Sequence, residues 1–380
     1  MPRLFTPAFF LMCGFTFTVF LSAFQLLPTA PFHIRDLGGS TFASGLFLGF
    51  LTYASAFSAP ITGAFADRVG QKRILVVTSL ALAVFSVIYA VLTDYRLLLA
   101  LAVVHGIFWS GLLSASSAYM TALLPETRRA EGIGYWGLST LLAIAVSPTV
   151  GFWIYRRGWV PLCAFAAVLN VIMAAIAWRL KEHPESADAS DHEPGGGLLE
   201  RRVLIVSVTL ALYSFGYGGI TSFTAMYADA NGVTPKGLYL TALAIVILLT
   251  RPVLGHLGDR LGYRQVFIPC LVLIACGLAL LAMGGTRVWL LASAVVFGIG
   301  YGTAYPTYVG YVMRGVSARR RGAAFGAILA AFDTGIGTGS TTMGWLIERY
   351  GFAAAFGTAA GLSALALPYF LAVDRWYAAE

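Results

Sequence analysis

The chain has 380 residues, of which 58% are hydrophobic and only 11% are charged, and its mean hydropathy is +0.79. Soluble domains contain about 45–50% apolar and about 25% charged residues, so this composition excludes a soluble globular protein. The net charge of +8 does not indicate nucleic-acid binding, because the basic residues form short clusters between long uncharged stretches, which is typical of membrane proteins.

Uncharged apolar stretches of about 20 residues recur along the chain. A helix of that length spans the ~30 Å hydrocarbon core, and only helices satisfy their own backbone hydrogen bonds there. The first stretch is too long for the apolar part of a signal peptide, so we expect an uncleaved first span. The sequence therefore predicts an all-α membrane protein with twelve transmembrane helices, at residues 8–27, 42–65, 74–93, 97–121, 132–154, 158–180, 202–228, 236–257, 265–283, 288–313, 321–347 and 351–374.

Residues 181–200 interrupt this pattern. Their sequence, KEHPESADASDHEPGGGLLE, is acidic, rich in Gly, Pro and Ser, and poor in apolar residues. Such a composition is typical of a flexible linker. We therefore predict one six-helix bundle over 1–180, a linker over 181–200 and a second six-helix bundle over 201–380.

Lysine and arginine residues are distributed unequally between the two sides of the membrane. With twelve spans, seventeen of them fall on the side that holds both termini and the linker, and seven fall on the other side. Because cytoplasmic loops carry the excess of positive charge, this distribution predicts a multi-pass protein of the cell (inner or plasma) membrane with both termini in the cytoplasm.

The loops after the second and eighth predicted spans have similar sequences, GAFADRVGQKR at 63–73 and GHLGDRLGYRQ at 255–265. An offset of 192 residues aligns the two loops and also aligns a proline, an arginine pair and a glycine outside them: Pro60 with Pro252, Arg128–Arg129 with Arg320–Arg321, and Gly134 with Gly326. A single offset at separate places indicates that the two halves are a parallel duplication, which is a known transporter design.

The loop pattern GxxxDRxGxxR, with its counterpart between the eighth and ninth spans, resembles the signature loop of the major facilitator superfamily of transporters. The resemblance implies the twelve-helix, two-bundle fold and a cytoplasmic gate formed by Gly63, Asp67, Arg68, Gly70, Arg73, Asp259 and Arg260. In such a gate Asp67 accepts from the N-terminus of a neighbouring helix or pairs with Arg73 or Arg129. The alternative is a charged turn that only sets the topology.

The fifth predicted span resembles part of a motif from proton-driven exporters of that superfamily, G-x8-G-x3-GP-x2-GG. Gly134, Pro148 and Gly151 match the motif, whereas three positions depart from it: Ala143, Ser147 and Phe152. Small residues and a proline still predict a bent, closely packed helix. Ala102 stands where many members carry an arginine in the fourth span, so a proton route through that arginine does not apply to this chain.

Three ionisable residues lie well away from the ends of predicted spans, where charge is costly and needs a reason. Asp333 lies about 16 Å into the eleventh span, close to the midplane, and is a candidate proton-coupling carboxylate or a structural one. Arg251 lies about 12 Å from the cytoplasmic end of the eighth span; it is expected to pair with Asp333, to bind an anionic substrate group or to extend to the interface. His105 is a candidate proton relay or a neutral packing residue.

Aromatic and amide side chains in the first, fourth, seventh and tenth spans are candidates for a substrate cavity, because the resemblance implies that these spans line it. They are Phe24, Gln25, Trp109, Tyr213, Tyr217, Tyr301, Tyr305 and Tyr308. Their helical spacing is equally compatible with packing between helices. A cavity rich in tyrosine and poor in charge suits a weakly polar or amphipathic solute.

These observations predict a secondary active transporter, most simply a proton-coupled exporter (an antiporter) of a small organic molecule that works by alternating access. The alternative is proton-linked or facilitated uptake of a sugar, an organic acid or a siderophore-like metabolite. The sequence has no ATP-binding loop and no hydrolase motif, which argues against an ATP-driven pump and an enzyme. The cysteines lie singly in apolar stretches, so we expect no metal and no cofactor. The expected partners are the solute, protons and the lipid bilayer, and we expect a monomer.

Overall fold

A computed structural model describes residues 4–182, 201–254, 257–314, 316 and 321–378. The side chains of Asp67, Ala130, Arg201, Arg202, Pro252, Val253, Asp259, 321–323 and 375–378 lie outside what is described. The described regular structure consists of helices: α1 (Pro7–Leu26), α2 (Ala30–Asp36), α3 (Thr41–Val69), α4 (Gln71–Val91), α5 (Tyr95–Leu123), the 3₁₀ turn η1 (Glu126–Arg128), α6 (Arg129–Tyr155), α7 (Trp159–Arg179), α8 (Arg201–Ala230), α9 (Leu238–Leu254), α10 (Leu257–Leu261), α11 (Tyr263–Met283), α12 (Arg287–Arg314) and α13 (Arg321–Ala378).

Each of the twelve predicted spans falls on one of these helices. In the described part, ten helices are long and apolar enough to cross a membrane, and α9 is a shorter apolar helix. The last two predicted spans are both contained in α13, which is broken at Gly351, where φ is +82°. The prediction of an all-α membrane protein is therefore confirmed. Helix α2 was not predicted, because a seven-residue helix is too short to give a periodic signal.

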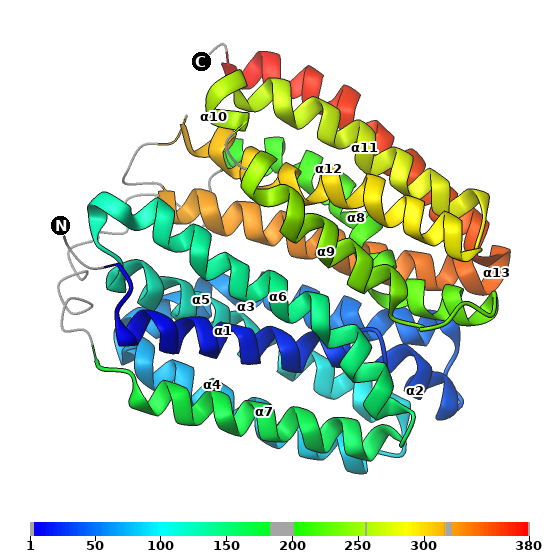
Figure 1. The fold of residues 1–380 in the computed structure, drawn as a ribbon, viewed down its shortest axis with the longest axis horizontal. Coiled ribbons are helices and arrows are strands. Elements are labelled where there is room, and N and C mark those ends of the chain that lie inside the picture. The colour runs from blue at the N-terminus through cyan, green and yellow to red at the C-terminus, as the bar shows by residue number, and fades with distance from the viewer. Residues whose placement is uncertain (1–3, 183–200, 255–256, 315, 317–320, 379–380) are drawn as a thin grey trace.

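Buried apolar side chains form a large hydrophobic core in each half of the described chain. One consists almost entirely of residues from α1 to α7, and the other almost entirely of residues from α8 to α13. Figure 1 shows the two groups of helices lying side by side. The division into 1–180, 181–200 and 201–380 stays a prediction, because residues 183–200 lie outside the described part.

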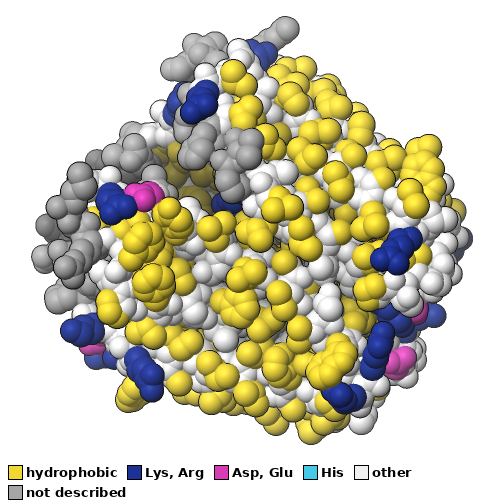
Figure 2. All heavy atoms as spheres, viewed as in Figure 1, with side chains coloured by type: hydrophobic (Ala, Val, Ile, Leu, Met, Phe, Trp, Pro, Cys, Tyr) yellow, Lys and Arg dark blue, Asp and Glu magenta, His cyan; other side chains and the backbone are white. Residues whose placement is uncertain are grey.

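The helices run roughly parallel to one another, and both ends of the chain lie at the same end of the bundle (Figure 1). We call this the terminal end and the other the opposite end. Figure 2 shows hydrophobic side chains over most of the visible face, with Lys and Arg side chains toward the two ends of the helices. This distribution matches a belt in contact with lipid between two charged interfaces.

The two similar loops have the same backbone geometry. Gly70 ends α3 with φ +99° and ψ 131°, and Gly262 precedes α11 with φ +95° and ψ 137°. Only glycine adopts such angles without strain, which costs another residue about 1–3 kcal/mol. The conserved geometry across the 192-residue offset explains why both loops keep a glycine at this position.

We therefore expect Gly70→Ala to lower the thermal midpoint of unfolding of the purified protein by several degrees. Gly134→Ala is the matched control, because Gly134 lies within α6 and an added methyl group there meets nothing within 4 Å. Alanine is better than glycine in a helix by about 1 kcal/mol, so this control should keep or raise the midpoint. Equal midpoints for the two variants would contradict the argument.

Candidate functional site

A cavity of ≈ 940 Å³ lies between the two halves. Its walls come from α1, α3, α5 and α6 of the first half and from α8, α9, α12 and α13 of the second. Lining residues extend from the middle of the bundle toward the terminal end, as far as Ala66 on α3, Ala118 on α5 and Arg251 on α9. The cavity therefore opens toward the terminal end.

At the opposite end the halves are in direct contact. The Ser340 hydroxyl of α13 donates to the carbonyl of Gly45 on α3 at 2.8 Å, and a methyl group added to Gly45 would overlap the carbonyl oxygen of Ser340. Closer to that end, the backbone N–H of Phe42 donates to the Glu348 carboxylate at 2.8 Å. These contacts close the cavity at the opposite end.

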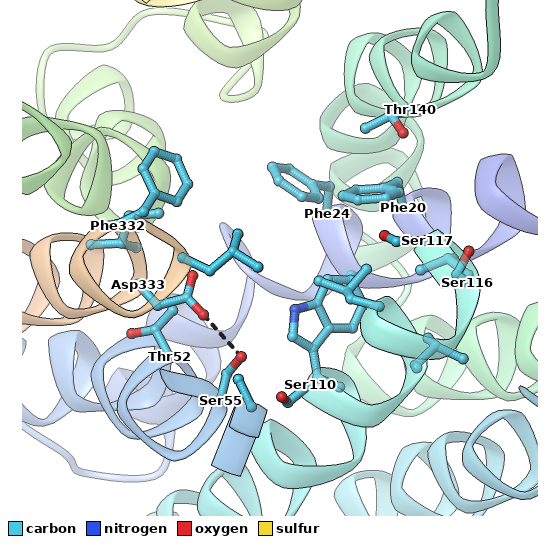
Figure 3. Close-up of a pocket in the computed structure, with 18 of the residues that line it drawn as sticks. Phe20, Phe24, Thr52, Ser55, Ser110, Ser116, Ser117, Thr140, Phe332 and Asp333 are labelled. Carbon is cyan, nitrogen blue, oxygen red and sulfur yellow. Dashed lines mark hydrogen bonds between the residues drawn. The ribbon is translucent and has the colours of Figure 1, made fainter. Parts of the chain in front are cut away.

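Asp333 lies on α13 in the wall of the cavity. The Ser55 hydroxyl of α3 donates to its carboxylate at 2.9 Å, so this hydrogen bond joins the two halves. Figure 3 shows Phe332 and Asp333 facing Phe20 and Phe24 of α1 across the cavity, with Ser55 below the carboxylate. Ser55, Phe20 and Phe332 were not among the predicted site residues.

Arg251 also lines the cavity and is partly buried. It lies beside Gly137 of α6 in the other half: a methyl group added there would lie 3.6 Å from Nη2 and 3.8 Å from both Cζ and Nη1. Among the described residues no ion pair joins Arg251 to Asp333, although the two share the cavity.

His105 on α5 is 7% exposed and forms part of the cavity wall. Its Nδ1 lies 3.3 Å from the hydroxyl of Tyr89 on α4, and its ring packs beside Phe85. These contacts hold the ring inside the first half. Its role as a relay or a packing residue stays a prediction.

The predicted aromatic set divides into two groups. Five residues line the cavity: Phe24, Trp109, Tyr217, Tyr301 and Tyr305. Tyr217 stacks on Tyr301 with ring centroids 4.4 Å apart, and Phe20 packs edge-on against Trp109 at 5.8 Å. The walls thus present aromatic rings on both halves.

The other three predicted cavity residues are fully buried and lie outside the lining: Gln25, Tyr213 and Tyr308. Gln25 packs against Gly151 of α6, where an added methyl group would lie 2.9 Å from its Cβ. The Tyr308 hydroxyl lies 3.0 Å from that of Ser207 in α8, and Tyr213 packs edge-on against Tyr301 at 6.0 Å. These side chains support the cavity wall from behind.

The residues of the exporter-like helix connect α6 to its neighbours. Ser147 donates to the carbonyl of Leu21 in α1 at 3.2 Å. Pro148 lies against Gly237 just before α9, where an added methyl group would be 3.1 Å from the proline Cβ. Together with Gly151, these contacts hold α6 close to α1 and to the second half, whereas Gly134 lies in open space.

The predicted gate lies at the terminal end. Gly63 lines the mouth of the cavity, and Arg68 and Arg260 are exposed. Arg73 pairs with Glu182 at 3.3 Å, both side chains being exposed. Asp67 and Asp259 have side chains outside the described part, so their gating role stays a prediction.

Comparisons with known proteins place this architecture in context. The family model described as Major Facilitator Superfamily matches residues 11–250 and 206–376. The chain is 25% identical over 363 residues to the "Uncharacterized MFS-type transporter YhhS" of Escherichia coli K12, covering 93% of this chain and 89% of that one. It is 21% identical to the "Staphylopine export protein" of Staphylococcus aureus, covering 88% of each chain.

Two solved structures have a similar fold. The nucleoside transporter NupG, as its D323A mutant, has a TM-score of 0.80 at 16% identity, covering 96% of this chain and 99% of that one. The human organic anion transporter MFSD10 has a TM-score of 0.72 at 16% identity, covering 96% and 100%.

Proposed function

Because the chain belongs to the Major Facilitator Superfamily, we propose that this transporter exports a small organic solute across the cell membrane in exchange for protons, by alternating access. In that mechanism the two halves rock around a central site, which opens to one side of the membrane at a time. The observation that carries the proposal is the position of Asp333, whose carboxylate lies in the cavity wall and is bonded to Ser55 of the other half.

The charge on Asp333 determines how strongly the halves are joined at this point. Hydrogen bonds to charged groups contribute about 1.5–3 kcal/mol, and those between neutral groups contribute about 0.5–1.5 kcal/mol. Exchange of solute for protons requires that a transporter with neither proton nor solute bound does not switch between its two states. The bond from Ser55 to ionised Asp333 supplies that restraint, and binding of either a proton or the solute releases it.

Export, rather than uptake, is supported by two observations. The fifth span keeps Gly134, Pro148 and Gly151 of the exporter motif, and one relative is named as an export protein. If both termini are cytoplasmic, as the basic residues predict, then the described state opens its cavity to the cytoplasm, the side from which an exporter takes its solute and to which an importer releases it.

The test uses everted membrane vesicles from cells that overproduce the chain, incubated with the small-molecule fraction of the same cells. The vesicle interior is acidified, and its contents are identified by mass spectrometry. We expect at least one solute to accumulate relative to empty-vector vesicles and to leave when a protonophore is added. Accumulation that requires an alkaline interior would favour uptake, and accumulation that ignores the pH gradient would overturn the proposal.

A further inference from the structure

Arg251 presents hydrogen-bond donors to the cavity that no described residue accepts. A methyl group added to Gly137 would lie at similar distances from Cζ, Nη1 and Nη2, so the guanidinium presents its face to α6. The N–H groups of arginine lie in that plane and point outward from its edge, so packing on its face does not engage them. Among the described residues, no hydrogen bond or ion pair is made by this side chain.

The duplicated fold does not require a positively charged side chain at the position of Arg251. Ala59, which the 192-residue offset aligns with Arg251, lines the same cavity from the first half. A charged side chain within a membrane costs at least about 2.5 kcal/mol, and such residues usually mark a substrate or ion path. The duplicated fold therefore forms with alanine at this position, and the guanidinium is an addition to the second half.

The carboxylate and the imidazole of the described lining already have partners. The Asp333 carboxylate accepts from Ser55 at 2.9 Å, and His105 lies 3.3 Å from the Tyr89 hydroxyl. Arg251 thus supplies a positive charge to the cavity wall, and no described residue accepts a hydrogen bond from its donors. A positive guanidinium attracts an acidic solute, repels a cationic one and forms two parallel hydrogen bonds with a carboxylate.

The rest of the lining suits an apolar body. Phe20, Phe24 and Trp109 line the first half, and Tyr301 and Phe332 line the second. The rings of Phe332 and Tyr301 lie 6.4 Å apart, and Phe20 and Phe24 lie 5.9 Å apart. Aromatic walls with few polar groups bind flat apolar molecules, and the polar groups fix their orientation.

We propose that the transported solute is an amphipathic organic anion, whose carboxylate binds the edge of the Arg251 guanidinium beside Gly137 while its apolar part packs between the aromatic walls. This inference rests on the proposed function, since it names the substrate class of the same cavity. It assigns Arg251 to solute recognition and leaves proton exchange to Asp333.

The test measures binding of three naphthalene probes that differ only in charge, by equilibrium dialysis with the purified full chain. The probes are 2-naphthoate, 2-naphthalenemethanol and 2-naphthylmethylamine. We expect 2-naphthoate to bind at least tenfold more tightly than the alcohol, and the amine to bind more weakly than the alcohol. Arg251→Gln should remove the preference for naphthoate, and Arg251→Lys should keep part of it, because lysine retains the charge but not the paired donors.

A second variant changes the neighbour of Arg251 and leaves the positive charge of Arg251 in place. Gly137→Leu fills the space beside the guanidinium and should weaken naphthoate binding several-fold. Unchanged binding of the alcohol shows that each variant keeps its cavity. The proposal is overturned if naphthoate does not bind, if it binds no better than the alcohol, or if its advantage survives in Arg251→Gln.

The outcome of the vesicle experiment and the outcome of the binding experiment can each contradict one proposal without the other. Accumulation of a cationic solute in acidified vesicles would contradict the anion and preserve proton-coupled export. A naphthoate preference that depends on Arg251, without any proton-dependent accumulation, would preserve the binding site and contradict the exchange mechanism.

Discussion

Asp333→Asn is expected to abolish accumulation driven by a proton gradient while solute exchange across the membrane continues. Asparagine has nearly the shape of aspartate and still accepts a hydrogen bond from Ser55, but it binds no proton in the physiological range. A gradient of two pH units, at one proton for each solute molecule, supports roughly 100-fold accumulation, because each unit is worth 1.36 kcal/mol. The variant should accumulate no solute above equilibrium.

The measurement uses proteoliposomes with a fixed pH gradient and the solute identified from the vesicle experiment. Asp374→Asn is the matched control, since this carboxylate also lies on α13, is buried and pairs with Arg264 at 3.1 Å outside the cavity lining. The control should keep most of the accumulation. Full gradient-driven accumulation by Asp333→Asn would remove Asp333 from the coupling mechanism.

The fold could be predicted from the sequence because its main signals depend on local composition. A membrane helix needs a sufficient length of apolar residues whatever it packs against, so spans such as 74–93 and 265–283 were found within a few residues of α4 and α11. The matching loop glycines helped to reveal the duplication. The positive φ at Gly70 and Gly262 gives the physical reason why both loops keep a glycine there.

The lining of the cavity could be predicted only in part, because spacing along a helix defines a face but not what covers it. Gln25 follows Phe24 and is turned by 100° around α1, so the two side chains point to different neighbours. Phe24 reaches the cavity, whereas Gln25 packs against Gly151 of α6. Tyr213 lies one turn from Tyr217 but is covered by Tyr301.

Pairing of Arg251 with Asp333 was suggested because both charges lie inside apolar spans. Both side chains line the cavity, but the described partner of the Asp333 carboxylate is Ser55, and Arg251 lies beside Gly137 of α6. Such a pairing depends on how two helices are placed relative to each other, which spacing along each helix does not define. Ser55, the partner that Asp333 has in the structure, is one of many small polar residues in apolar spans, and no motif or spacing distinguishes it from the others.

Gly45→Leu is expected to prevent closure at the opposite end and to shift the transporter toward a state whose cavity opens there. The backbones of α3 and α13 approach so closely at Gly45 that even a methyl group would overlap the Ser340 carbonyl. A ligand or substitution shifts a two-state equilibrium by its differential effect on the two states. This overlap is present only when the opposite end is closed, so the larger side chain destabilises the described state selectively, and transport should fall at least tenfold.

The shift is measured by thiol labelling of Ser117→Cys, which lies in the cavity lining toward the terminal end, in a variant whose native cysteines are replaced by serine. With Gly45→Leu, labelling of Ser117→Cys from the terminal side should slow at least tenfold. Gly361→Leu is the matched control, because Gly361 is exposed and an added methyl group there meets nothing within 4 Å. Equal labelling rates in the two backgrounds would mean that contact between α3 and α13 does not determine which end of the cavity is open.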